Sequence, residues 1–244
     1  MSMDEREFFI FGEPVETELG TVRFLTYKEY LLHLSELSLI TLNVLHLYYR
    51  YMKQIDKNDK DALEALERFK ELSLHEIVVN DPSFVNNYAK MFEMVIEPSP
   101  HFQGNVFEQI FKDENLFMYY RNLIMSMNLL SEEEVSPNPE IQKFIEMKQN
   151  VHKPKEESSF TDIVSSIVAG TSNTFNDVCN MTVFQVYAVY YRMGAIFDYN
   201  TSTLFATVSE KVKIESWGRH LDLFNKDNGT IKKDKFDKKF GSML

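Results

Sequence analysis

The residues best suited to metal chemistry lie near the C-terminus, where residues 223–231 resemble a calcium-binding loop. An EF-hand loop needs glycine at its sixth position and a bidentate glutamate at its twelfth. If Asn225 is taken as the first position, the twelfth is Phe236; if Gly229 is taken as the sixth, the twelfth is Lys235. Neither of these residues supplies a carboxylate. We therefore predict a glycine-containing turn here and no metal ion.

Other candidate ligands and nucleophiles stand alone in the sequence. Glu29 and His33 lie four residues apart on one helical face, but no second pair of ligands accompanies them. Cys179 precedes an expected helix, but the sequence indicates no general base that would activate its thiol. A half-buried structural cysteine is the better interpretation. Gly170 and Gly194 are isolated, which excludes a phosphate-binding glycine loop. The sequence therefore predicts no catalytic residue, no metal and no cofactor, and hence a protein that is not an enzyme.

The composition narrows the function further. The 244 residues carry a net charge of −11, which argues against general nucleic-acid binding because phosphates require Lys and Arg. The 20 Phe and 12 Tyr accompany only 8 Gly, a balance typical of packed helices. A single cysteine excludes an intrachain disulfide and favours a reducing cytoplasm. No apolar run approaches the roughly 18 residues of a membrane span, so we do not expect a membrane as a partner. Because of the negative net charge, we do not expect a nucleic acid as a partner either.

The pattern of apolar residues predicts a mainly α protein, made of multi-helix domains with a small N-terminal β-hairpin element. The hairpin falls within residues 7–25, where apolar and polar residues alternate around a glycine-containing turn. Four parts are expected along the chain: an N-terminal β-hairpin and helical domain (1–130), a linker with one short helix (131–159), a C-terminal helical unit (160–226) and a basic, mobile tail (227–244).

Helix-start signals and apolar spacing predict the individual helices. Thr26 with Glu29, and Thr182 with Gln185, form capping boxes, in which each side chain accepts a hydrogen bond from the other residue's backbone N–H. The predicted helices span about 26–52, 61–72, 82–95 after Asp81-Pro82, 100–128 after Ser99-Pro100, 139–149, 160–169, 173–179, 183–193, 201–210 and 214–224.

Aromatic residues are concentrated near the C-terminus, and two interpretations of them stay open. Phe184, Tyr187 and Tyr191 share one stripe of an expected helix, and Trp217 follows in the last expected helix. Together with Tyr190, Phe197, Tyr199 and Phe205, they form either the core of their unit or, in part, an exposed patch that takes a partner helix. Under the second interpretation the first three residues line a groove and Trp217 braces it.

The tail combines basic and aromatic residues between Lys232 and Phe240. Such interleaving occurs in proteins that bind single-stranded nucleic acid. Asp234 and Asp237 dilute the positive charge, and the rest of the chain is acidic, so a frayed, solvated terminus is the default interpretation. Docking of the tail on an acidic protein surface is the alternative that stays open.

Three segments resemble the tail assembly chaperones of long-tailed bacteriophages that infect Gram-positive bacteria. The first two resemble the start of these proteins and their Met-Thr-x-x-Gln-x-Tyr helix, and the third resembles their closing Trp helix. They read Phe9-Ile-Phe-Gly-Glu-Pro-Val-Glu-Thr17 with Leu19-Gly-Thr-Val-Arg-Phe-Leu25 and Lys28-Glu-Tyr30; Met181-Thr-Val-Phe-Gln-Val-Tyr187; and Glu215-Ser-Trp217 with Arg219-His-Leu221. Residues 203–207 depart from the family's Leu-Ala-Gly segment, and residues 31–159 carry no matching motif.

The resemblance implies a non-catalytic protein of viral morphogenesis, made in the host cell cytoplasm. Such chaperones coat the tape measure protein, recruit tail tube subunits and leave before the virion is complete. The tape measure protein and the tail tube protein are therefore the expected partners, and self-association with a second copy of the chain is a further candidate. A shallow aromatic groove suits the apolar stripes of a long helical chain. The alternative function is a structural tail or baseplate component that stays in the virion.

Overall fold

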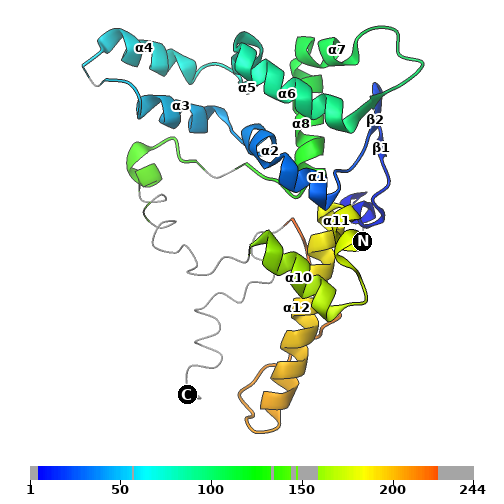
Figure 1. Ribbon diagram of the computed structural model, residues 1–244. Helices are drawn as coiled ribbons and strands as arrows, with labels where there is room; N and C mark the ends of the chain where they lie inside the picture. Colours follow the sequence, from blue (N-terminus) through cyan, green and yellow to red (C-terminus); the bar gives the residue numbers. More distant parts are fainter. Residues whose placement is uncertain (1–4, 57, 133–134, 144–146, 148–158, 225–244) are drawn as a thin grey trace. The chain divides into compact units, whose positions relative to one another are not determined.

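The computed structural model describes residues 5–56, 58–132, 135–143, 147 and 159–224 (Figure 1). Two compact units divide the chain: a central unit of residues 13–157, and a terminal unit in which residues 1–12 join residues 158–244. The described part is mainly α with one small antiparallel sheet, which confirms the predicted fold class. The sequence grouped residues 7–11 with a β element of the N-terminal domain. They instead form a 3-10 helix, η1 (Glu5–Phe11), which packs on a C-terminal helix of the terminal unit.

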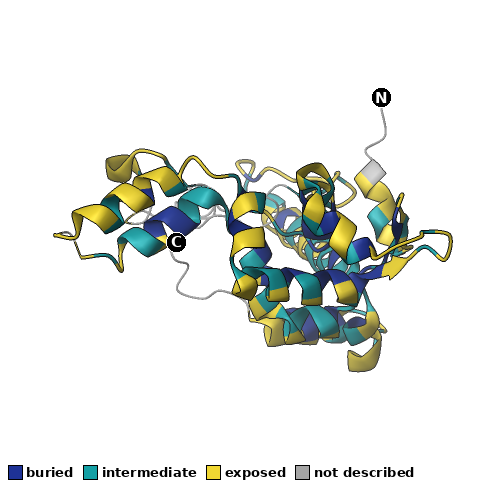
Figure 2. Ribbon diagram, turned by 90° about the horizontal axis from the view of Figure 1, so that it is seen from above, coloured by how far each residue is buried: buried dark blue, intermediate teal, exposed yellow. Residues whose placement is uncertain are grey.

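The central unit holds the sheet and the first eight α-helices. These are α1 (Tyr27–Leu32), α2 (Leu34–Ile40), α3 (Val44–Met52), α4 (Lys60–Phe69), α5 (Leu74–Asn80), α6 (Pro82–Val95), α7 (Val106–Lys112) and α8 (Glu114–Met127). Residues 139–143 are also helical, at the start of the helix predicted over 139–149. Figure 2 shows buried and exposed residues alternating along the helices, as expected for helices that each bury one face.

The sheet has three strands, β1 (Val15–Glu16), β2 (Gly20–Val22) and β3 (Ile96–Pro98), in that order. The β1–β2 hairpin was predicted, whereas β3 follows directly from the end of α6 and carries no strand pattern in the sequence. Gly20 has φ +150, and a Cβ there would lie 2.2 Å from the carbonyl oxygen of Glu97. Only glycine therefore allows β2 to approach β3 this closely.

The single helix expected over 26–52 is wrong, since α1, α2 and α3 replace it. Asn43 ends the run because its Oδ1 accepts a hydrogen bond from the backbone N–H of His46 at 3.0 Å and caps α3. The backbone carbonyl groups that lack a helical partner at the end of α2 accept hydrogen bonds from a side chain far along the sequence. Arg121 is fully buried, and its guanidinium donates to the carbonyl oxygens of Ile40 at 2.9 Å and Leu42 at 3.1 Å.

The helix expected over 100–128 is also divided. The backbone N–H of Ser99 donates to the carbonyl of Leu19 at 2.9 Å, so this residue extends the sheet and does not start a helix. Asn105 caps α7 instead, and Asp113 caps α8 through bonds to the N–H groups of Asn115 and Leu116. Helix α5, which the prediction omitted, begins at a capping box formed by Ser73 and Glu76.

The terminal unit contains η1, α10 (Phe160–Gly170), α11 (Phe175–Asn180) and α12 (Val183–Ala206). Helix α12 replaces the two helices expected over 183–193 and 201–210. Gly194 does not interrupt it, since a single glycine in a helix costs only about 1 kcal/mol. Figure 1 shows the C-terminal half of α12 extending past α10, with the chain after residue 206 running back along it.

Residues 214–224, all of which are described, form turns and no helix, so the predicted Trp helix is wrong. Two side chains bind the backbone locally instead. The hydroxyl of Ser216 accepts from the N–H of Gly218 at 3.2 Å, and Oδ1 of Asp222 accepts from the N–H of Phe224 at 3.0 Å. Such turns compete with helix formation. The basic tail expected over 227–244 and the calcium-like residues from 225 onward lie outside the described residues.

Candidate functional site

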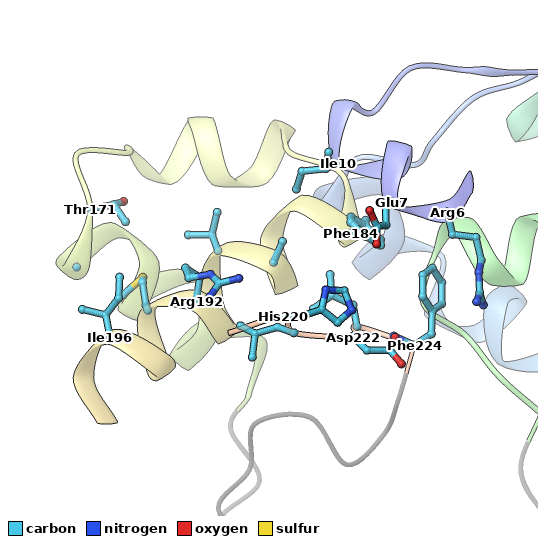
Figure 3. A pocket seen from close by; sticks show the side chains of 16 residues that line it. Arg6, Glu7, Ile10, Thr171, Phe184, Arg192, Ile196, His220, Asp222 and Phe224 are labelled. Carbon is cyan, nitrogen blue, oxygen red and sulfur yellow. The ribbon is translucent and has the colours of Figure 1, made fainter. Parts of the chain in front are cut away.

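An apolar groove in the terminal unit is the main concave feature of the described C-terminal residues. It has a volume of about 710 Å³ and is walled by η1, the end of α10, α12 and residues 220–224 (Figure 3). Its apolar lining includes Ile10, Phe184, Ala188, Val189, Met193 and Leu221, and its charged lining includes Arg6, Glu7, Arg192 and Asp222. An apolar wall with charged groups at its margin suits a peptide segment with one apolar face.

The start of α12 fixes the first wall of the groove. The backbone N–H of Gln185 donates to Oγ1 of Thr182 at 3.2 Å, and the N–H of Thr182 donates to Oε1 of Gln185 at 2.9 Å. The predicted capping box is therefore confirmed. Nε2 of Gln185 donates in addition to the carbonyl oxygen of Ile10 at 2.9 Å. One side chain thus caps α12 and holds η1 against it.

Two phenylalanines from distant parts of the sequence, Phe184 and Phe224, line one end of the groove, and Phe9 packs against both. The ring centroids of Phe9 and Phe184 lie 6.1 Å apart, and those of Phe184 and Phe224 lie 5.8 Å apart. The guanidinium carbon of Arg6 lies 4.3 Å from the ring centroid of Phe224, a cation–π geometry. Figure 3 shows Arg6 and Phe224 side by side at this end.

Arg192 holds the returning chain on the opposite wall. Its Nη1 donates to the carbonyl oxygens of Trp217 and Arg219, the latter at 2.9 Å. Arg219 also pairs with Glu215, with 2.9 Å between Nη1 and Oε2. These contacts fix the position of residues 220–224, which supply the third wall. The pairing of Arg192 with two carbonyls has no pattern in the sequence that would have predicted it.

The structure separates the residues predicted to bind a partner. Phe184 lines the groove but is only 6% exposed, so its ring forms part of the wall and little of the open surface. Tyr187 and Tyr191 contact each other, with ring centroids 5.8 Å apart, and neither lines the groove. Burial, and to a lesser extent the neighbouring Tyr190, raises the pKa of Tyr191. Trp217 lies half exposed in a turn.

Sequence reasoning missed the small and flexible residues that make the groove. Ala188 and Arg192 follow Phe184 at spacings of four, so all three belong to the face of α12 that borders the groove. Ala188 leaves space that a larger side chain would fill. The spacing of four is present in the sequence, but Ala188 and Arg192 carry no aromatic or apolar signal that would distinguish this face of α12. The contributions of η1 and residues 220–224 depend on tertiary contacts alone.

The second predicted capping box, in the central unit, is part of an ion pair. Thr26 and Glu29 cap α1 as predicted. The Glu29 carboxylate also accepts from both terminal nitrogens of Arg23, at 2.9 and 3.0 Å. The hydrogen bond from Arg23 is the main reason that the pKa of Glu29 falls to about 2. This ion pair stabilises the junction of the sheet and α1.

Within the described residues, no group of three or more His, Cys, Asp or Glu side chains is arranged to hold a metal ion. Cys179 is a half-buried free thiol. Among the described helices, none is both long and apolar enough to cross a membrane.

The comparisons with known proteins define first a class and then a family. The chain is 32% identical over 224 residues to the SPbeta prophage-derived protein YomV of Bacillus subtilis strain 168. The aligned residues make up 91% of each of the two chains. This similarity indicates a phage-derived protein. The profile of the YomV N-terminal domain matches residues 3–137, and the profile of the YomV second domain matches residues 152–222. The chain therefore belongs to the YomV family. No solved structure matches it.

Proposed function

We propose that this protein is a phage tail assembly chaperone, which binds the tape measure protein and helps recruit tail tube subunits in the host cell without catalysis. The apolar groove of the terminal unit carries the proposal. A groove of about 710 Å³ with an apolar floor and charged margins fits one face of an amphipathic helix. A tape measure protein is a long helical chain with such faces. The prophage-derived relative is consistent with this setting.

The groove suits reversible binding. Ala188, Val189 and Met193 offer an apolar wall. Of the two phenylalanines that line the groove, Phe184 is only 6% exposed and Phe224 is covered in part by Arg6, so little aromatic surface is left as an anchor. Interfaces without central aromatic anchors are commonly weak. Many weakly bound copies along one long chain would still cover it, because each partner segment presents another site. A chaperone that has to leave before the tail tube closes needs this combination.

The test is a binding titration between the purified chain and the tape measure protein of the same phage or prophage. Val189→Glu places a carboxylate in the apolar wall and is expected to weaken binding at least about tenfold. Val79→Glu is the matched control, because Val79 is partly exposed on α5 of the central unit. Equal binding by both variants, or no binding by the unchanged chain, would overturn the proposal.

Two further measurements separate the remaining possibilities. The double variant Tyr187→Ala and Tyr191→Ala tests the stripe predicted from the sequence. Because neither tyrosine lines the groove, unchanged binding by this variant would eliminate the stripe and leave the groove as the site. Mass spectrometry of purified virions distinguishes a chaperone, which is absent from them, from a structural tail or baseplate component, which is present.

A further inference from the structure

The C-terminal half of α12 presents an apolar face that the described residues leave uncovered. Phe197 is 59% exposed, Leu204 69%, Phe205 41% and Val208 80%. Gly194, Phe197, Thr201, Leu204 and Val208 follow one another at spacings of three and four, with Val208 in the turn just after the helix. This is the spacing of the seam between two paired helices. We call these five residues the α12 seam.

The α12 seam lies on a different face from the groove. At 100° per residue, its members centre about 160° around the helix from Ala188, Arg192 and Ile196, which line the groove. The buried residues of this half of the helix, Ala195 and Ser202, also lie away from the seam. The seam is therefore free to be occupied while the groove holds another segment.

Small and large side chains alternate along the seam, so that the seam of a second copy can fit against it. Gly194 and Thr201 are small, whereas Phe197 and Leu204 are large. If two α12 helices pair in antiparallel, one register sets Gly194 opposite Leu204 and Thr201 opposite Phe197, and the same two contacts recur on the other side of the twofold axis. An isologous interface requires this kind of self-complementary surface. Apart from its chain neighbours and the backbone of its own helix, no described atom lies within 4 Å of a Cβ placed on Gly194, so the space above it is open.

Charge and area favour the same occupant. Asp198 is the only charged residue between Gly194 and Ser209, so two copies would meet without rows of like charges and a charged partner would find little to pair with. The exposed parts of the seam residues Phe197, Leu204 and Val208, together with the neighbouring Phe205, amount to roughly 500 Å² on each copy, hence at most roughly 1,000 Å² in total if pairing covers all of it. That area lies at the lower limit for a specific interface, so a weak dimer that depends on protein concentration is expected.

We propose that the α12 seam pairs two copies of this chain in antiparallel through Gly194, Phe197, Thr201, Leu204 and Val208. The inference does not rest on the proposed function, because it concerns a different face and a different partner. In a chaperone, pairing would join two grooves and raise the avidity for one long chain.

Sedimentation of the full chain over a range of concentrations tests the pairing. The unchanged protein is expected to shift from monomer to dimer in the micromolar range, and Leu204→Glu to weaken dimerisation at least tenfold. Leu32→Glu is the matched control, since Leu32 is also 69% exposed but lies on α1. Circular dichroism of each variant checks that it is folded.

A second variant fills the space in the seam without disturbing the monomer. The Cβ of Gly194→Leu meets no described atom beyond its chain neighbours and the backbone of its own helix, and the change removes a helix-destabilising glycine, so the monomer is expected to stay folded. It is expected to block dimerisation, because its side chain would occupy the space of the partner's Leu204. A wild-type chain that stays monomeric, or a dimer that neither Leu204→Glu nor Gly194→Leu weakens, would overturn the proposal.

Salt provides an independent readout. Because each copy carries a net charge of −11, overall repulsion opposes pairing, and screening by added salt is expected to strengthen an apolar dimer. A dimer that dissociates as salt rises would instead be held by charges, which the seam lacks, and would contradict the proposed interface.

Discussion

Gln185 and Ile10 lie 175 residues apart in the sequence, yet the Gln185 amide donates to the Ile10 carbonyl at 2.9 Å. The same side chain accepts from the N–H of Thr182 and completes the cap of α12. A helix-start signal that is readable from the sequence therefore has a second task, which only the folded chain reveals. It connects the first described helix to the last one.

Replacement of Gln185 is expected to weaken the terminal unit. Gln185→Ala removes the bond to Thr182 and the bond to Ile10, and each is worth about 0.5–1.5 kcal/mol. A loss of about 2 kcal/mol in the free energy of unfolding is expected, measured by urea denaturation. Gln109→Ala is the control, because Gln109 is exposed on α7. A loss no greater than that of the control would show that η1 is held by its apolar contacts alone.

Arg121 is expected to be the most sensitive charged residue of the central unit. It is buried, donates to Ile40 and Leu42, and forms an ion pair with Glu132 at 2.6 Å. Arg121→Met leaves those carbonyls without their donor and removes the cation that pairs with Glu132, and should cost about 3 kcal/mol in the free energy of unfolding. The exposed Arg50, changed to Met, should cost less than about 0.5 kcal/mol in the same denaturation experiment.

Acid is expected to weaken the junction between the sheet and α1. The folded pKa of Glu29, about 2, lies below its ordinary value of 4.5, so its contribution to stability is complete above pH 4.5 and is lost as the pH falls toward 2. The contribution is on the order of 1 kcal/mol, allowing for the partial exposure of the pair. Glu29→Gln should flatten the stability profile between pH 4.5 and 2, whereas the exposed Glu93→Gln should not. Identical profiles for the two variants would contradict the role of the Arg23 pair.

Division of the chain between its two units is expected to affect them unequally. Residues 13–157 are continuous and should unfold cooperatively when expressed alone. Residues 158–244 lack η1, and with it the ring contact of Phe9 with Phe184. They should show cooperative unfolding only after a peptide of residues 1–12 is added, which calorimetry would detect. Cooperative unfolding of the C-terminal fragment without the peptide would show that η1 is dispensable.

The sequence predicted those structural features that depend on contacts between residues close together in the chain. The capping boxes at Thr26 and Thr182 hold in the structure because each forms within four residues. The hairpin before α1 was predicted for the same reason. The third strand was not, because β3 pairs with β2 across more than 70 residues and its own residues have no strand pattern.

Distant contacts decided the features that the sequence could not predict. The end of α2 depends on Arg121, which lies about 80 residues further along the chain. Residues 214–224 showed a helical apolar pattern, but Arg192 draws the carbonyls of Trp217 and Arg219 toward α12. The predicted stripe of Phe184, Tyr187 and Tyr191 lies on one helix, yet only Phe184 reaches the groove, since η1 and residues 220–224 determine where the groove lies.

Residues 6–10 and residues 220–224 both contribute to the walls of the groove. The ribosome makes the first of these segments early in translation and the second near its end. A ribosome-bound chain that has made η1 and even α12 still lacks the last wall. The central unit can fold in the meantime, before the terminal unit that includes residues 1–12 has been fully synthesised. The complete groove therefore exists only in molecules that have been translated through residue 224, and a nascent or prematurely terminated chain lacks one of its walls.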